Sequence, residues 1–162
     1  MVAVLALAAV LSAAPAPKPG CANAESRQFD FWVGRWKVFD AKSGERAGSS
    51  LIEKLYGGCA LRENWSEPGF SGGSLNIYAK SDGRWHQTWV DEAGALREFV
   101  GGVEDGKMVL LAKGRTPDGR PVEIRMIFTP NPDGTVRQFS DYSLDGGGAW
   151  AVRYDYLYRP AR

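Results

Sequence analysis

The stretch Phe29-Asp-Phe-Trp-Val-Gly-Arg-Trp36 decides how the rest of the chain folds. Its first four residues include three aromatic side chains, which are too apolar and too closely spaced to remain in water. Gly34 allows the backbone to turn sharply, and Trp36 then lies inside the first extended run. The stretch therefore predicts a short N-terminal aromatic plug that caps one end of a closed β-barrel.

Tight turns divide the sequence that follows. Asp-Gly pairs recur five times, and the runs between them are rich in Val, Ile, Tyr, Trp and Thr. An Asp-Gly pair between such runs is the strongest local signal for a β-hairpin. Sequential strands joined by short turns form a meander, and closure into a barrel removes its two exposed edges. The sequence therefore predicts an all-β fold, a single up-and-down antiparallel β-barrel of about ten strands centred near Val38, Ile52, Glu63, Ile77, Thr88, Phe99, Leu110, Arg125, Phe139 and Tyr154.

Length, charge and the N-terminal run bound the class of protein. A chain of 162 residues suits one domain with a sizeable core. The net charge is +1 and no basic stripe is present, which argues against nucleic acid and anionic membrane as partners. Residues 1–24 form a short apolar run followed by small residues, which is typical of a signal peptide and too short to span a bilayer. We therefore expect an export segment at 1–24, a barrel domain at 25–162, and a periplasmic or secreted protein that does not insert into a membrane after processing.

Two cysteines, Cys21 and Cys59, form an even number, which favours a disulfide bond in an oxidising compartment. The bond depends on where the signal peptide is cleaved. Cleavage after Ala14-Pro-Ala16 keeps Cys21, whereas cleavage after Ala22-Asn-Ala24 removes it and leaves Cys59 as a free thiol. The sequence leaves both alternatives open.

The predicted strands have no purely apolar face. Trp65 shares a face with Leu61 and Glu63, and Gln87 shares a face with Trp89. A barrel interior that mixes rings, amides and charges is typical of a hydrated ligand cavity, and barrels with this many strands enclose space. The alternative is that strands near the rim are irregularly amphipathic and that rings fill the interior.

Five sequence blocks, taken in order, resemble a family of exported bacterial proteins that is similar to the calycins, which include lipocalins, fatty-acid-binding proteins and nitrobindin. The blocks are Phe29–Trp36, Gly58–Trp65, Gly73–Tyr78, Trp85–Asp91 and Ser143–Trp150. The resemblance implies a ten-stranded calycin-like barrel in which Trp36 takes the part of the lipocalin Gly-x-Trp tryptophan. It also implies that Trp36 stacks on an arginine of the last strand, either Arg153 or Arg159. It implies no particular activity.

Several kinds of site are not expected. His86 is the only histidine, so a metal cluster of several histidines cannot be assembled. Nitrobindin-like proteins hold haem through a histidine late in the chain, and the last predicted strand has none, so no haem, metal or other cofactor is expected. The run Ser143-x-Asp145-x-Gly147-x-x-Trp150 resembles a sialidase Asp-box, but a single copy is expected to brace a hairpin.

These observations predict a binding protein for a small, partly apolar organic molecule. Two alternatives are a barrel enzyme of isomerase or cyclase type, with Glu63 and Tyr78 as acid and base, and a structural or interaction module with a filled interior. Apolar pockets need rings for shape and a few polar groups for orientation. The predicted ligand-binding residues come from three consecutive strands and two later strands opposite them: Glu63, Trp65, Asn76, Tyr78, Gln87, Trp89, Arg125 and Gln138.

Overall fold

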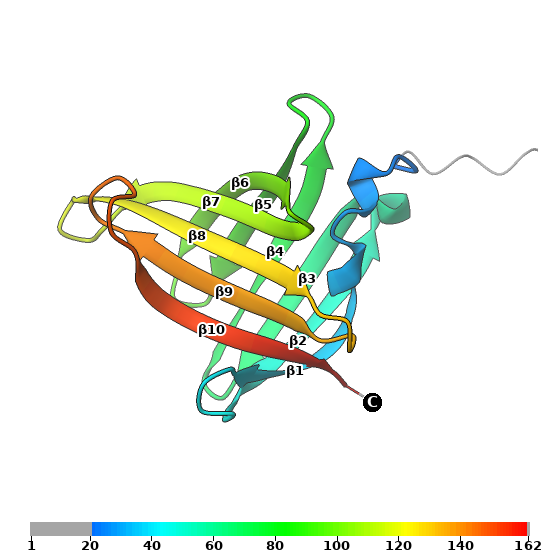
Figure 1. Ribbon diagram of the computed structural model, residues 1–162, viewed down its shortest axis with the longest axis horizontal. Helices are drawn as coiled ribbons and strands as arrows, with labels where there is room; N and C mark the ends of the chain where they lie inside the picture. The colour runs from blue at the N-terminus through cyan, green and yellow to red at the C-terminus, as the bar shows by residue number, and fades with distance from the viewer. Residues whose placement is uncertain (1–20, 162) are drawn as a thin grey trace, which may run out of the picture.

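The computed structural model describes residues 21–161 as a closed barrel of ten antiparallel strands (Figure 1). Each strand pairs with the next along the chain, and the last pairs with the first. The predicted all-β, up-and-down barrel is therefore confirmed. Its elements are η1 (Glu25–Arg27), η2 (Asp30–Trp32), β1 (Gly34–Asp40), β2 (Arg46–Leu55), η3 (Tyr56–Gly58), β3 (Ala60–Glu67), β4 (Phe70–Ala79), β5 (Arg84–Asp91), β6 (Leu96–Glu104), β7 (Lys107–Arg115), β8 (Pro121–Pro130), β9 (Val136–Ser143) and β10 (Ala151–Pro160).

The predicted signal peptide at residues 1–24 lies outside the described residues except for its last four positions. Within residues 21–161, none of the helical segments has the length and apolar character needed to cross a bilayer.

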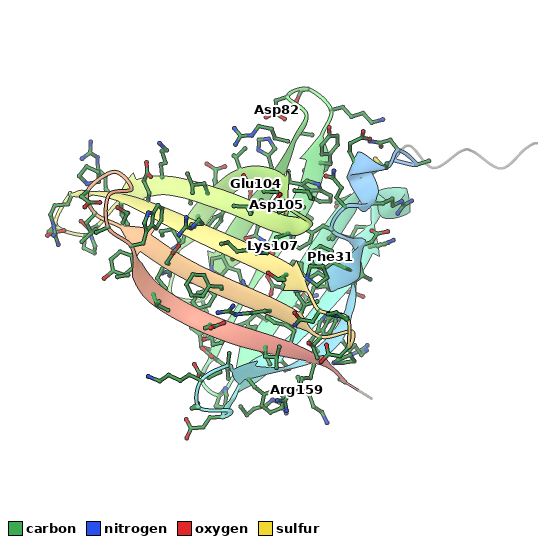
Figure 2. The ribbon with its side chains drawn as sticks, viewed as in Figure 1. Phe31, Asp82, Glu104, Asp105, Lys107 and Arg159 are labelled. Atoms are coloured by element: carbon green, nitrogen blue, oxygen red, sulfur yellow. A yellow bond between two sulfur atoms is a disulfide. The ribbon has the colours of Figure 1, made fainter. Side chains whose placement is uncertain are left out.

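The N-terminal segment forms the aromatic plug that the sequence predicts. Phe29 and Trp32 are fully buried, and their rings stack with centroids 4.9 Å apart. Phe29 also meets the rings of Trp85 and Phe128 edge-on, at 5.6 and 4.9 Å. The indole N–H of Trp36 donates to the Trp32 carbonyl at 2.8 Å, which fixes the plug to the start of β1. Figure 2 shows Phe31 of this segment at the end of the barrel that also carries Asp82 and the β6–β7 hairpin.

The predicted stack of Trp36 on Arg153 or Arg159 is wrong. The ring of Trp36 packs edge-on against Tyr158 instead, with centroids 6.1 Å apart. Neighbouring residues of a strand point to opposite faces, so Arg159 points outward when Tyr158 points inward. Its guanidinium lies 4.7 Å from the ring centroid of Phe39, near the end of β10 (Figure 2).

Cys21 and Cys59 form the predicted disulfide bond across 38 residues of sequence. Cys59 follows η3 in the connection between β2 and β3. The bond therefore ties the beginning of the plug to a hairpin connection of the barrel. Disulfides of this kind persist in oxidising compartments.

All five Asp-Gly pairs lie in connections between consecutive strands. Asp105 and Gly106 form a two-residue loop in which both residues have positive φ, as a type I′ turn requires, and Glu104 pairs with Lys107 beside it (Figure 2). The other four pairs lie in longer connections, where only the glycine has a positive φ: Asp82-Gly83, Asp118-Gly119, Asp133-Gly134 and Asp145-Gly146.

Candidate functional site

The barrel encloses a cavity of about 240 Å³ away from the plug. Glu67 and Phe70, which flank the β3–β4 turn, mark its rim, together with Asp91 at the end of β5. The interior is therefore filled by rings at the plug end and hollow at the other, where the β7–β8 and β9–β10 hairpins lie (left in Figure 1). The cavity is lined by Glu63, Trp65, Glu67, Phe70, Gln87, Trp89, Asp91, Arg97, Phe99, Met126, Gln138, Arg153, Tyr154, Tyr156 and Tyr158.

Glu63 places a carboxyl in the cavity wall with only 4% of the residue exposed. Its Oε1 accepts a hydrogen bond from Ser50 Oγ at 3.1 Å, and its Oε2 accepts one from Ser74 Oγ at 2.9 Å. Ser74 lies directly opposite Glu63 in the β3–β4 register. Burial raises the pKa of Glu63 to about 7, although the two hydroxyls favour the ionised form. Glu63 therefore exchanges its proton near neutral pH.

A chain of hydrogen bonds leads across the barrel wall to this carboxyl. Gln87 Nε2 donates to Asn76 Oδ1 at 2.7 Å, and Asn76 Nδ2 donates to Ser74 Oγ at 3.0 Å. Asn76 Nδ2 also donates to the carbonyl of Leu61 at 3.2 Å. Asn76, predicted as a ligand-binding residue, is fully buried and does not line the cavity; its hydrogen bonds connect Gln87 with Ser74 instead. Every bond in the chain donates toward Glu63, and such chains strengthen one another in a low dielectric.

Stacked rings form one side of the cavity. Trp65 of β3 stacks on Tyr156 of β10 at 5.8 Å, and Tyr156 stacks on Tyr154 at 4.7 Å. β3 and β10 are not neighbours in the barrel, so this stack crosses the interior. The sequence suggested that the rings of β3 to β5 meet along one wall, but Trp65 stacks across the barrel rather than on Trp89.

Glycines hold the two tryptophans of the cavity in place. A Cβ at Gly48 would lie 2.8 Å from the ring of Trp65, and a Cβ at Gly72 would lie 2.6 Å from the ring of Trp89. Real Cβ atoms do not approach other atoms so closely. Each ring therefore lies over backbone that only glycine leaves uncovered.

The rim carries a second carboxyl whose pKa shifts the other way. The indole N–H of Trp89 donates to Asp91 Oδ2 at 2.9 Å, and Arg97 Nη1 lies 3.6 Å from the same oxygen. The backbone N–H of Ala95 donates to Oδ1 at 3.0 Å. These donors, with the indole first, hold the pKa of Asp91 below its usual range. The cavity thus combines an ionised carboxylate at the rim with a carboxyl inside that titrates near pH 7.

Gln138 lies in the cavity wall, as predicted. Its Oε1 accepts a hydrogen bond from Tyr158 Oη at 2.6 Å. Its Nε2 contacts only the sulfur of Met126, at 2.9 Å, and Tyr154 Oη, at 3.4 Å. Sulfur is a weak acceptor, so this amide can donate to a carbonyl or hydroxyl oxygen of a guest.

Arg125, predicted as a binding residue, does not line the cavity. Its neighbour Met126 lines the cavity, so Arg125 points outward from the same strand. There its guanidinium binds both oxygens of Asp141, at 3.1 and 2.6 Å, and lies 4.3 Å from the ring centroid of Trp150. Ser143 Oγ donates to Asp145 Oδ1 at 2.6 Å in the adjoining connection, which braces the hairpin as predicted.

Tyr78 is also displaced from its predicted place. It faces inward but lies at the plug end, where its ring packs against Trp85 at 6.2 Å. The predicted acid and base pair of Glu63 and Tyr78 is therefore not assembled in the cavity. The tyrosines that face Glu63 are Tyr154 and Tyr158 of β10, and burial raises the pKa of Tyr154 to about 12 and that of Tyr158 well above its usual value.

Sequence reasoning missed the contribution of β10. Tyr154, Tyr156 and Tyr158 recur with a period of two, which is the signal for side chains on one face of a strand. That signal was sufficient to place all three rings inside the barrel. A bulge between Val152 and Tyr154 interrupts the β9–β10 register, and it turns Arg153 toward the cavity rim.

The barrel wall opens beside the rim. The β6–β7 ladder begins at Val100 opposite Leu111, so Leu96–Phe99 pairs only with β5 and Ala112–Arg115 pairs only with β8. The space between these segments is a groove of about 520 Å³. Arg97 lines both the groove and the cavity, so the two openings lie side by side.

His86, the single histidine of the sequence, does not line the cavity. His86 points outward from β5, and its Nε2 lies 2.8 Å from Asp82 Oδ2 on the surface. Within residues 21–161, no three or more His, Cys, Asp and Glu side chains are grouped to hold a metal ion.

Comparison with known proteins found no family model that matches this chain and no curated protein that matches it significantly in sequence.

Proposed function

We propose that this protein is an exported carrier that binds one small, partly apolar organic molecule in the barrel cavity. The observation that carries the proposal is a cavity of about 240 Å³ that combines stacked aromatic rings with a buried carboxyl. An apolar cavity of about 150 Å³ is enough to hold benzene. This cavity therefore suits a ring with a short polar side chain.

Export is supported by the disulfide bond. The Cys21–Cys59 bond is of the kind that persists in oxidising compartments, and it forms only in a mature chain that retains Cys21. This favours cleavage of the predicted signal peptide after Ala14-Pro-Ala16 over cleavage after Ala22-Asn-Ala24. The ten-stranded meander also supports the resemblance to calycin-like barrels, in which a hollow interior suits a carrier.

Native mass spectrometry of the protein purified from its own host tests the proposal. We expect a species that carries one small molecule per chain, and a mass for the protein that includes Cys21. The same measurement on Trp89→Ala tests the location of the molecule. This variant lacks one ring of the cavity and is expected to lose the adduct. An adduct that persists unchanged in this variant would place the molecule outside the cavity.

The raised pKa of Glu63 favours a second candidate function. A carboxyl with a pKa of about 7 is suited to act as a general acid or base at neutral pH. An isomerase or cyclase would then use Glu63 without Tyr78, which lies at the plug end. The two functions differ in the fate of the guest, because a carrier returns it unchanged. Chromatography of the recovered guest distinguishes them, and a new isomer that Glu63→Gln fails to produce would favour the enzyme.

A further inference from the structure

Glu63 is a buried carboxyl without a cationic partner in the described part of the chain. Its hydrogen bonds are those from Ser50 and Ser74, and no positive charge contributes to its pKa. Asp141, which is also buried, and Asp91, which is partly buried at the rim, each have an arginine within ion-pairing distance. A buried carboxylate that lacks such a partner is costly, and it either keeps its proton or acquires a positive charge.

The donors around Glu63 are arranged for the ionised form. The chain from Gln87 through Asn76 to Ser74 donates toward the carboxyl, and Ser50 donates to its other oxygen. A carboxylate has about four lone-pair sites. The two hydroxyls fill two of them, which leaves acceptor positions on a group that lines the cavity.

The charges at the rim do not neutralise Glu63. Two acids, Glu67 and Asp91, and two bases, Arg97 and Arg153, line the outer part of the cavity. Arg97 lies beside Asp91, and the guanidinium of Arg153 lies 5.6 Å from the ring centroid of Tyr154. With Glu63 ionised, the cavity therefore carries one unmatched negative charge, and that charge lies inside.

The aromatic rings of the cavity also favour a positively charged guest. Trp65, Tyr156 and Tyr154 line the cavity as a stack, and the aromatic faces that the stack leaves uncovered carry the negative end of the quadrupole, which attracts organic cations. The rings also supply apolar surface for the remainder of the molecule. A carboxylate and aromatic faces in one desolvated space favour a positively charged nitrogen next to an apolar group.

We propose that the guest of this cavity is an organic cation, an amine whose protonated nitrogen binds the carboxylate of Glu63 and whose apolar part packs on the ring stack of Trp65, Tyr156 and Tyr154. The inference rests on the proposed carrier function and names its ligand class. The guest supplies the positive charge that the chain does not provide, so its binding keeps Glu63 ionised.

A proton released near pH 7 can be assigned to Glu63, because the groups that face this carboxyl keep their own protons at that pH. From β10 they are the phenols of Tyr154 and Tyr158, and from β2 and β4 they are the hydroxyls of Ser50 and Ser74. Both phenols keep their protons near pH 7, because burial raises their pKa values. The charged groups farther out at the rim are Glu67, Asp91, Arg97 and Arg153.

Three probes with one ring and one chain length separate charge from shape: 2-phenylethylamine, 2-phenylethanol and phenylacetate. Calorimetric titration at pH 8 is expected to give an affinity for the amine at least about tenfold above that for the alcohol, with phenylacetate weakest. In Glu63→Gln the preference for the amine is expected to fall to about twofold or less. The matched control is Glu53→Gln, which removes the same charge from the outer face, where Glu53 pairs with Arg62 at 2.7 Å. It is expected to keep the preference.

Proton release by the wild-type protein provides a second readout that needs no variant. Burial raises the pKa of Glu63 to about 7, so binding of the amine near and below pH 7 is expected to release protons from the carboxyl. Titrations in two buffers with different ionisation enthalpies measure this release. Absence of release, or an equal loss of preference in Glu53→Gln, would overturn the role of Glu63.

The outcomes also separate this inference from the carrier function. Tighter binding of 2-phenylethanol or phenylacetate than of the amine would overturn the cationic guest while the carrier function stands. Failure of all three probes to bind at millimolar concentration would count against the carrier function itself.

Discussion

Glu63 makes the stability of the unliganded barrel depend on pH. Its pKa rises from the ordinary 4.5 to about 7 in the folded state, so the folded state binds the proton more tightly than the unfolded state. The contribution of Glu63 to the unfolding free energy is therefore fully present below about pH 4.5, and it is lost as the pH rises from there toward 7. The loss is about 3 kcal/mol, because each pKa unit is worth about 1.4 kcal/mol.

Comparison of the wild type with Glu63→Gln isolates this contribution from those of other carboxyls. We expect the variant to be about 3 kcal/mol more stable relative to the wild type at pH 8 than at pH 4. Urea unfolding at the two pH values measures the difference. If the stability difference between the variant and the wild type is the same at pH 4 and pH 8, Glu63 is solvated or paired in the folded state.

Trp89 and Trp85 test whether the two ends of the barrel differ in packing. Trp85 is buried at the plug end, whereas Trp89 is half-buried beside the cavity. Trp85→Ala is expected to cost about 3–5 kcal/mol of unfolding free energy, as in a filled core. Trp89→Ala is expected to cost clearly less and to weaken binding of the guest. Equal losses of stability, with binding intact, would indicate that the site lies elsewhere.

At the scale of single residues, the sequence predicted the cavity side chains of β3 and β5 better than those of later strands. Glu63, Trp65, Gln87, Trp89 and Gln138 line the cavity as predicted. Alternation places a residue inside or outside but says nothing of its height along the barrel axis. Tyr78 was misplaced for that reason, because it faces inward at the wrong end. Arg125 was expected on the inner face of the barrel. It lies on the outer face instead, where its guanidinium contacts Asp141 and the ring of Trp150.

At the scale of elements, Gly101 controls how β6 and β7 meet. A Cβ at this position would lie 1.9 Å from the carbonyl oxygen of Val109, next to the point where the two strands begin to pair. Gly101→Ala is therefore expected to force the strands apart, at a cost of about 1–3 kcal/mol or more. Gly102 is the matched control, because a Cβ there meets no atom within 4 Å.

Chemical denaturation of the two variants checks this prediction. Gly102→Ala is expected to remain within about 0.5 kcal/mol of the wild type, as is usual for a surface substitution. A Gly101→Ala protein as stable as Gly102→Ala would show that the strands do not approach so closely in solution.

The number and order of the strands could be predicted from turn chemistry, because each Asp-Gly pair specifies a local reversal of the chain. The opening between Leu96–Phe99 and Ala112–Arg115 could not be predicted from the sequence. Both segments have ordinary strand composition, and their separation depends on how the whole barrel curves. The stack of Trp65 on Tyr156 also joins strands that are distant in the barrel, which no local pattern indicates.

At the scale of the whole molecule, the disulfide bond limits the freedom of the unfolded chain. The bond closes a loop of 38 residues, for which loop-closure entropy predicts a stabilisation of about 4 kcal/mol. The double variant Cys21→Ser with Cys59→Ser is expected to lose about this much unfolding free energy. Urea unfolding of the variant and of the oxidised wild type measures the loss. Two reactive thiols in the denatured wild-type protein would contradict the bond.

The six tryptophans report on the whole molecule, because they are distributed among the cavity, the plug end and the outer face of the barrel. Trp65 and Trp89 line the cavity, and Trp150 lies outside against Arg125. The three tryptophans of the buried core at the plug end are Trp32, Trp36 and Trp85.

Binding of the guest in the cavity can be tested by the indole N–H signals of these six residues in a ¹H–¹⁵N spectrum. The spectrum is recorded during titration with the tightest-binding of the three phenylethyl probes. Binding in the cavity is expected to shift the signals of Trp65 and Trp89 with the probe concentration, while those of Trp32, Trp36, Trp85 and Trp150 stay in place. Shifts confined to Trp150 or to the plug tryptophans, with Trp65 and Trp89 unmoved, would contradict it.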